Sequence, residues 1–446
     1  MSKIRLYGSS SGYIDIAPAA AASNNTLTAP STVGEIIAKD AAGAIGITSM
    51  KASNVNVGAA VTITESGIEA SGIGITVANI NGAQIGGRRN IIINGAMEVA
   101  QRGAAATTDQ LYQTVDRMRL GRSGVDGNPS QEQLTLGTGT DVYALGFRKS
   151  YKIINGNQTS GAGVTDSISV SYRVEARDIR TSGWDYVNPN SFITLSFWSY
   201  STVGQTYYLR LRSMDGTSQN YTMSYTLPAN TWTKVVKTIP GNSNIQFDDD
   251  VNQGLQINWF LYSGTDYTSS SMTLNSWAAY DSTNQSPDQT TTWYTTNDAT
   301  WNITGLQLEV GSQATPFEHR NFGDELALCQ RYYCKSYDYD TVPGTNTVVG
   351  TRWGRNYSDA NRSANPTGNC TFPVTMRTLP TLSVYSKTGT LGSWTKGGTS
   401  PSSASTDEAV SGYYSTLSEN GFFALQGINP SAANWYGGHF TAEAEI

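Results

Sequence analysis

The sequence predicts a mainly β protein with a thin N-terminal β segment, a jelly-roll β-sandwich body and a C-terminal β domain. The chain has 25 Tyr, 11 Phe and 10 Trp, yet no aromatic residue lies between Tyr13 and Tyr112. Period-two alternation recurs along the rest of the chain, and it is typical of strands. Only 14% of the residues are charged, against roughly 25% in an average soluble protein. We therefore predict three parts, residues 1–89, 90–320 and 321–446.

Residues 1–89 lack the large rings that dominate ordinary cores, each of which covers roughly 150–250 Å². Short alternating runs at 55–58, 61–64 and 73–77, with glycines between them, indicate strands. A flexible linker is the alternative interpretation. The alternation favours an ordered β-rich shaft, because small residues let three chains approach one axis and satisfy each other's strand edges. This segment therefore predicts a homotrimer.

Residues 90–320 show strands at regular intervals, separated by Gly, Asn, Ser and Asp turns. The clearest of them are Ser167–Val174, Phe192–Tyr200, Tyr207–Arg212, Leu255–Tyr262 and Trp301–Val310. No helical period crosses this region. Many antiparallel strands joined by such turns predict a β-sandwich of the jelly-roll type.

Residues 321–446 begin with the one segment that shows a convincing helical pattern, which predicts a short helix over 324–335. Asp324 and Glu325 lie in its first turn, where acidic groups favour the helix dipole. Leu326, Cys329 and Tyr333 form one apolar stripe. A β-rich unit follows, containing 372–384 and a closing strand over 439–446 that we expect to be ordered.

Charge and cysteine content exclude several classes of function. The net charge of −6 and the pI near 5.1 give no support to nucleic-acid or anionic-membrane binding. The N-terminus has no apolar stretch of signal-peptide length and no run of about 18 apolar residues occurs, so we expect cytoplasmic synthesis without membrane insertion. Cys329, Cys334 and Cys370 cannot all pair internally, so reduced, partly buried thiols are expected.

Catalysis has few candidate residues. The chain has two histidines, His319 and His439, and a nucleophile pair would need a cysteine to meet one of them. The cysteine and histidine spacings match no zinc pattern. Paired carboxylates could hydrolyse a polysaccharide, and 248–250 is the densest acidic run. Aspartates between strands are usually turn residues, however. We expect no catalytic residues and no enzymatic activity.

Several segments together resemble tail-fibre proteins of bacteriophages, in particular phages of cyanobacteria and other aquatic bacteria. They are Leu306–Glu318 followed by Glu325–Tyr333, then 373–380 with the C-terminal strand, and Asn90–Gly103. The last of these resembles the opening strand of a middle domain that is similar to jelly-roll carbohydrate-binding modules, in which the first and last strands lie side by side.

The resemblance implies a homotrimeric fibre in the virion, assembled in the host cytoplasm and attached to tail or baseplate proteins through its N-terminal segment. Its tips would adsorb to a host cell-surface polysaccharide. A head fibre or capsid decoration protein and a polysaccharide-depolymerising tailspike are the alternatives. The resemblance implies no cofactor, although likeness to carbohydrate-binding modules allows a structural calcium ion with Glu98 as one ligand.

Sugar binding needs flat apolar rings beside hydrogen-bonding groups. In the tip, the candidates are the loop-like residues Trp353, Arg355, Tyr357, Trp435 and Tyr436. In the body, the mixture of rings and polar groups occurs around Trp184, Trp277 and Trp293. Tryptophans inside predicted strands, such as Trp198 and Trp259, are expected to pack in the core instead.

Overall fold

The computed structural model describes residues 4–7, 13–16, 89–355, 368–397, 406–409, 414–424 and 435–446. The chain forms two compact units, 1–75 and 76–446. In the first unit the described residues form one antiparallel hairpin of β1 (Ile4–Tyr7) and β2 (Tyr13–Ile16). Apart from this hairpin and Arg89, the predicted shaft over 1–89 lies outside the described residues, and the homotrimer stays a prediction.

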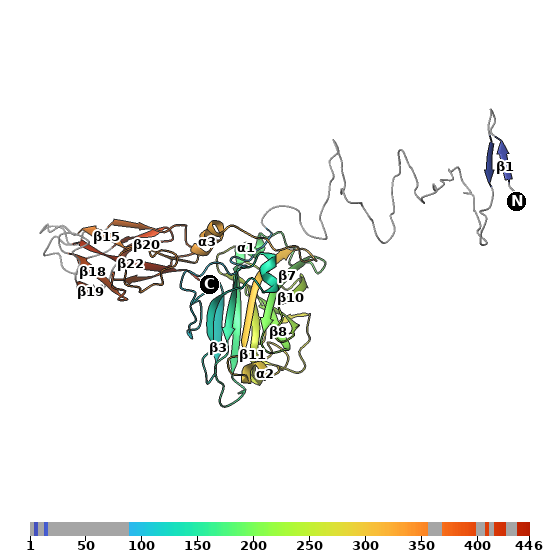
Figure 1. Ribbon diagram of the computed structural model, residues 1–446, viewed down its shortest axis with the longest axis horizontal. Coiled ribbons are helices and arrows are strands. Elements are labelled where there is room, and N and C mark those ends of the chain that lie inside the picture. Colours follow the sequence, from blue (N-terminus) through green and yellow to red (C-terminus); the bar gives the residue numbers. More distant parts are fainter. Residues whose placement is uncertain are drawn as a thin grey trace. The chain divides into compact units, whose positions relative to one another are not determined.

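The second unit contains a β-sandwich of two antiparallel sheets, as the sequence predicted (Figure 1). The five-stranded sheet has the order β10 (Thr233–Pro240), β7 (Phe192–Ser201), β13 (Thr300–Val310), β5 (Lys149–Ile154), β4 (Ser130–Thr135). The six-stranded sheet has the order β12 (Trp277–Ala279), β9 (Gln219–Leu227), β8 (Gln205–Ser213), β11 (Gln253–Ser263), β6 (Ser167–Glu175), β3 (Arg119–Ser123). The main hydrophobic core lies between the sheets.

Alternation along each strand decides which side chains enter this core. On β7, Ile193, Leu195 and Phe197 are fully buried in it, whereas Trp198 and Tyr200 point to the opposite face and are only partly buried. Trp259 on β11 is fully buried in the core, as predicted. Trp198 also packs against buried hydrophobic residues, but in a smaller cluster on the outer face of the five-stranded sheet, because alternation along β7 turns it away from the main core.

The predicted opening strand over 90–103 lies beside the last sandwich strand but is not a regular strand. The N–H of Ile91 donates to the carbonyl of Leu308 at 2.9 Å, and the N–H of Leu306 donates to Gly95 at 2.8 Å. The ladder cannot continue because Asn94 and Met97 both have φ of 61°. The pairing with β13 was therefore predicted correctly, and the regular conformation was not.

The predicted helix over 324–335 is correct only in its first half. The helix α3 (Phe322–Gln330) begins after Asn321, whose side chain accepts the N–H of Asp324 at 2.9 Å. Residues 333–335 form the strand β14 (Tyr333–Lys335) instead, because their backbone pairs with the closing strand. Two further helices, α1 (Ala176–Arg180) and α2 (Thr292–Thr295), are too short to show a period in the sequence.

The tip is built around the closing strand β22 (Trp435–Glu443), which pairs with β14, β15, β17 and β18. The other tip strands are β15 (Arg352–Arg355), β16 (Gly368–Thr371), β17 (Thr381–Tyr385), β18 (Ser393–Gly397), β19 (Thr406–Ala409), β20 (Tyr414–Ser418) and β21 (Gly421–Ala424). Its core includes Phe372, Trp394, Phe422 and Phe440. With 41% strand and 8% helix, the mainly β class is confirmed.

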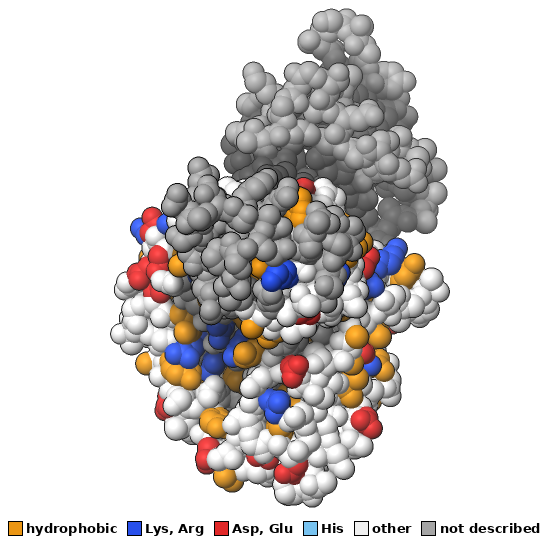
Figure 2. Space-filling model, turned by 90° about the vertical axis from the view of Figure 1, so that its left-hand side faces the viewer, with side chains coloured by type: hydrophobic (Ala, Val, Ile, Leu, Met, Phe, Trp, Pro, Cys, Tyr) orange, Lys and Arg blue, Asp and Glu red, His pale blue; other side chains and the backbone are white. Residues whose placement is uncertain are grey.

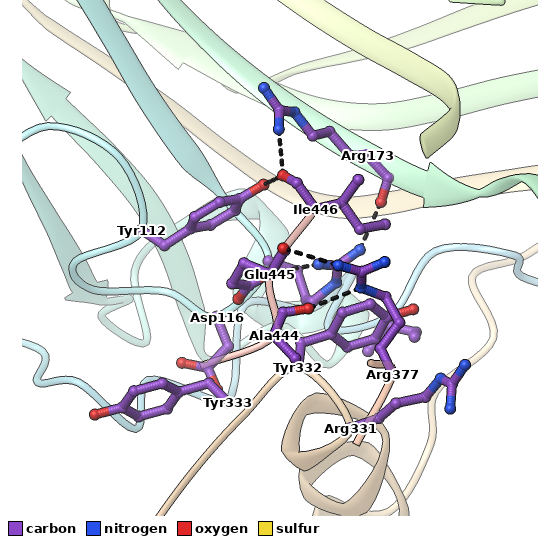
Figure 3. A network of polar contacts seen from close by, with 12 residues as sticks. Tyr112, Asp116, Arg173, Arg331, Tyr332, Tyr333, Arg377, Ala444, Glu445 and Ile446 are labelled. Atoms are coloured by element: carbon purple, nitrogen blue, oxygen red, sulfur yellow. Dashed lines mark hydrogen bonds and ion pairs between the residues drawn. The ribbon is translucent and has the colours of Figure 1, made fainter. Parts of the chain in front are cut away.

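Buried charges join the tip to the sandwich (Figure 3). The guanidinium of Arg117 forms an ion pair with Glu445 and lies 3.5 Å from the ring centre of Tyr332. Burial favours its neutral form, yet Glu445 and the nearby tyrosines hold the pKa of Arg117 well above its usual value. Arg377 donates to the carbonyls of Ala444 and Glu445 at 2.8 and 3.1 Å. The last residues described thus lie inside a buried polar network.

Candidate functional site

The outer face of the five-stranded sheet carries a groove of about 330 Å³ that is lined by two aromatic rings and several polar groups. Strand pairing sets one row across four strands: Glu132 opposite Lys152, Lys152 opposite Asn302, and Asn302 opposite Tyr200. Trp232, just before β10, follows Tyr200 at the end of the row. Cross-strand partners share a face, so the register alone brings these side chains together.

The two rings of this groove are held in a fixed relation. The centroids of Tyr200 and Trp232 lie 5.7 Å apart with an interplanar angle of 41°. The hydroxyl of Tyr200 donates to Asn230 Oδ1 at 3.0 Å, which restricts rotation of the ring out of the groove. Both rings are partly buried, so each offers some apolar surface to solvent. We call Tyr200, Trp232, Lys152 and Asn302 the ring groove.

The polar side of the ring groove offers hydrogen bonds but no lining carboxylate among the described residues. The Lys152 ammonium contacts Glu132 at 2.8 Å, which fixes it beside the groove while leaving other donor positions. Sequence reasoning missed this site. The alternation of side chains along β7 could have revealed it. Ile193, Leu195 and Phe197 enter the core, so Trp198 and Tyr200 must face away from it.

The structure brings together four of the five tip residues that the sequence singled out, Trp353, Arg355, Trp435 and Tyr436, and places them on paired strands instead of the loops that were predicted. Antiparallel pairing of β15 with β22 places Arg355 opposite Trp435, Gly354 opposite Tyr436 and Trp353 opposite Gly437. Trp353 is partly buried, and its indole N–H donates to the hydroxyl of Thr351 at 2.8 Å. Trp435 is also partly buried.

The remaining tip candidates differ in what they can offer. Tyr436 is only 3% exposed, which leaves little ring surface for a ligand. Of Arg355 the structure describes the backbone pairing, and Tyr357 lies outside the described residues. Gly437 permits the approach of β15, because a Cβ there would lie 2.5 Å from the Trp353 indole and 2.4 Å from the Arg352 carbonyl.

The rings predicted as candidates in the body are largely structural. Trp184 is 3% exposed and Trp293 is fully buried in the core. Trp277 is partly buried against the same core, and its indole donates to the carbonyl of Pro240 at 2.7 Å. These side chains therefore stabilise the sandwich and leave the outer-face rings as the better candidates.

The cysteines and histidines make structural contacts. Cys329 is fully buried, and burial raises the pKa values of Cys334 and Cys370 to about 12 and about 11. His319 contacts the carbonyl of Leu145 at 3.1 Å. His439 contacts Ser336 and Thr347 at 3.2 and 3.0 Å and stacks on Tyr337 at 3.6 Å. None of the contacts described for either histidine is with a thiol, and the predicted buried thiols are confirmed.

The acidic run serves a turn beside α1. Asp249 pairs with Arg177 at 3.1 Å, and Asp250 accepts the backbone N–H of Asn252 at 3.0 Å. The N–H of Asp248 donates to Asp215, whose pKa is raised by burial and by the neighbouring Asp248 and Asp250 carboxylates. These roles match the turn interpretation of the sequence.

Within the described ranges, no cluster of three or more His, Cys, Asp or Glu side chains could hold a metal ion. Glu98, the residue named for a structural calcium ion, is partly buried, and burial raises its pKa. The charges that oppose this shift come from Lys149 and Arg148. Two cations beside a carboxylate disfavour a calcium ion there.

The surface is dominated by uncharged polar groups. Figure 2 shows scattered acidic side chains and one place where Lys and Arg gather beside hydrophobic side chains. Among the residues described, no helix is long and apolar enough to cross a membrane.

Comparison with known proteins gives no family. No family model matches the chain, and no curated protein matches it. Among solved structures, the enzymatically active domain of tailspike protein 4 of bacteriophage CBA120 is 11% identical over 50% of this chain and 21% of that chain, with a TM-score of 0.26. A putative sugar-binding protein of Bacteroides thetaiotaomicron is 9% identical over 50% of this chain and 99% of that chain, with a TM-score of 0.28.

A third similar structure is the family 11 carbohydrate-binding module of a Clostridium thermocellum cellulase. It is 11% identical over 49% of this chain and 99% of its own, with a TM-score of 0.24. Similarity this weak carries no inference about function. The case for function therefore depends on the residues of this chain.

Proposed function

We propose that this protein is a phage tail fibre, a virion protein that adsorbs to a host cell-surface glycan without cleaving it. The resemblance of Leu306–Glu318 and Glu325–Tyr333 to phage fibres supports the assignment to a virion. The ring groove supports the assignment to a glycan. In this proposal the fibre is a homotrimer, and its N-terminal segment binds other virion proteins of the tail or baseplate.

The ring groove is the observation on which glycan binding depends. The partly exposed rings of Tyr200 and Trp232 offer apolar surface against which the C–H face of a pyranose can stack. Lys152 lies on the same row and supplies donors for sugar hydroxyls, whereas the amide of Asn302 is only 3% exposed and adds little to the accessible polar lining. Apolar lining with a few placed polar groups is the usual character of a ligand site. Three equivalent copies would convert weak contacts into firm adsorption.

The tip candidates Trp353, Arg355, Tyr357, Trp435 and Tyr436 form the second part of this proposal. The pairing of β15 with β22 places the partly exposed Trp353 and Trp435 two residues apart along the register, and Tyr357 lies outside the described residues. A tip contact would act together with the ring groove on one polysaccharide, since both belong to the same chain.

A glycan array of the full-length protein tests this proposal. We expect binding to a restricted set of oligosaccharides, and loss of most of that signal in Trp232→Ala. The matched control is Trp277→Phe, which changes a tryptophan that packs against the core. Failure of the wild-type protein to bind any glycan, with the fold intact by circular dichroism, would contradict the proposal.

Depolymerisation is tested in the same samples by measuring new reducing ends during incubation with the bound polysaccharide. We expect none, because the described lining of the ring groove contains no carboxylate and glycoside hydrolysis normally needs two. Steady release of oligosaccharides would favour a depolymerising tailspike. Labelling of the protein on intact particles separates a tail fibre from a head fibre or decoration protein.

A further inference from the structure

The outer face of the six-stranded sheet carries four arginines in an arrangement that no described acidic side chain neutralises. Strand register places Arg119 opposite Ser171, Ser171 opposite Asn258, and Asn258 opposite Arg210. The next row places Arg173 opposite Gln256 and Gln256 opposite Arg212. Directly opposed residues share a face, so all four side chains lie on one face of the sheet. Arg210 is buried there beside Gln285 and Tyr280, whereas the other three arginines are partly exposed. We call Arg119, Arg173, Arg210 and Arg212 the arginine patch.

The charges around the arginine patch are unusual for a protein with a net charge of −6. The two rows and the row that follows, through Ser169, Phe260 and Tyr208, contain no Asp or Glu. Glu175, two residues beyond Arg173 on β6, is bound at both carboxylate oxygens by Arg331, at 2.9 and 2.8 Å. Arg173 donates to an oxygen of Ile446, so the positive charge that the described neighbours do not balance belongs to Arg119, Arg210 and Arg212.

The pKa shifts of Arg210 and Arg119 also indicate that no carboxylate lies close to either side chain. Burial, with a further contribution from Arg212, lowers the pKa of Arg210 to about 10. Burial and then the neighbouring Arg173 lower the pKa of Arg119. A nearby carboxylate would oppose both shifts, and instead the opposing groups are tyrosines, Tyr280 beside Arg210 and Tyr112 and Tyr151 beside Arg119.

Beneath the arginines lie buried polar atoms that have no hydrogen-bond partner within the described part of the chain. Ser171 Oγ and Asn258 Oδ1 are two of them, on residues that are 2% and 9% exposed. Arg210 Nε and Arg173 Nε are two more, although other nitrogens of these side chains donate to Gln285 and to an oxygen of the last residue, Ile446. Leaving such a group unpaired destabilises the folded protein. Buried atoms of this kind point to a missing partner.

A ligand at the arginine patch must match two kinds of group, the guanidinium groups and the unpaired amide oxygen. Guanidinium groups require an anion, and Arg matches the planar geometry of a carboxylate or sulfate. The Asn258 amide oxygen requires a hydrogen-bond donor, which an inorganic anion lacks and a sugar hydroxyl supplies. Arg119, Arg173, Gln256 and Arg212 are partly exposed, so a ligand can reach the rows from solvent.

We propose that the arginine patch is a second binding site, separate from the ring groove, for an acidic sugar that carries a carboxylate or a sulfate. The acid group lies between the guanidinium groups, and the sugar hydroxyls bond to Ser171 and Asn258. Arg119 and Arg210 stand three strands apart, which spans roughly 14 Å at the usual strand spacing. The surface therefore accommodates more than one sugar residue.

Calorimetric titration of the full-length protein tests this site with four probes: tetragalacturonate, a sulfated galactan tetrasaccharide, the neutral maltotetraose and sodium sulfate. We expect binding to at least one acidic oligosaccharide, and the two acidic probes show whether carboxylate or sulfate is preferred. Arg212→Gln and Arg119→Gln should each weaken that binding roughly tenfold or more, because each removes one charge-assisted contact. Arg180→Gln on α1 removes the same charge from a distant exposed position and should change nothing.

The outcomes separate this proposal from the ring groove. If acidic probes bind and respond to Arg212→Gln but not to Trp232→Ala, the arginine patch is a site of its own. If maltotetraose or sulfate alone binds as tightly as the acidic oligosaccharides, or if no acidic probe binds, the proposal is wrong. A change of molecular mass in Arg212→Gln by light scattering would also contradict it, because the patch would then be a contact between copies.

Discussion

Replacement of Arg117 by Met tests whether the buried charges that join the tip to the sandwich act as one network. The Arg117 side chain is 1% exposed, and that of its partner Glu445 is 3% exposed. Arg117 also donates to the carbonyl of Arg173 at 2.6 Å. Met keeps most of the apolar stem of the side chain and removes the charge and its donors. The substitution therefore isolates the polar contribution.

The expected cost follows from what the substitution leaves behind. Removing one partner of a buried ion pair costs about 3–5 kcal/mol, because the other charge stays buried. Arg102 remains 3.3 Å from Glu445, so the lower end applies, about 3 kcal/mol. The lost hydrogen bond to Arg173 adds about 1 kcal/mol. We expect a total destabilisation of about 4 kcal/mol in the free energy of unfolding.

Urea unfolding of the full-length protein, followed by tryptophan fluorescence, measures this value. The control is Arg148→Met, at an exposed arginine that lies 3.7 Å from the ring centre of Tyr143, where we expect less than about 1 kcal/mol. The double variant of Arg117→Met with Glu445→Met should be more stable than Arg117→Met alone, since both charges are gone. An Arg117→Met variant within about 1 kcal/mol of wild type would refute the network.

Three further outcomes are expected. The tip should become less stable as the pH falls below about 6.5, because burial lowers the pKa of His439 in the folded state and the unfolded state then binds the extra proton. In urea titrations between pH 5 and 7.5, His439→Gln should remove this pH dependence. Gly437→Ala should cost roughly 1–3 kcal/mol through its clash with Trp353, read by thermal unfolding, while Gly139→Ala, which has open space, should not. Light scattering should give three times the 47.9 kDa of one chain, and a mass near 47.9 kDa would remove the shaft hypothesis.

The strands of the sandwich could be predicted because their signal is local. Period-two alternation in Phe192–Tyr200 and Leu255–Tyr262 needs no knowledge of the partner strand. The irregular course of 90–103 could not be read this way. Asn94 and Met97 have positive φ, and their backbones bond to the side chains of Glu325 and Gln133, which lie farther along the chain. Residues 333–335 show the same limit, because pairing with β22 overrides a helical pattern.

The sequence predicted the candidate sites less completely than the strands, because a site on a sheet depends on how neighbouring strands are aligned. The tip set was found by composition, and β15 does pair with β22 at those residues. The ring groove and the arginine patch combine single residues from several strands, such as Asn302 with Tyr200 and Asn258 with Arg210. The relevant sequence clue was parity: an aromatic or an arginine between two core positions must face outward.

Glycan binding through the ring groove is most directly tested by calorimetry with the oligosaccharide that gives the strongest array signal. We expect Trp232→Ala to weaken binding by about 2 kcal/mol, roughly 30-fold, as truncation of a central aromatic contact usually does. Tyr200→Phe keeps the ring and should have a smaller effect. Equal affinity of the wild type and Trp232→Ala for that oligosaccharide would contradict the proposed role of the groove.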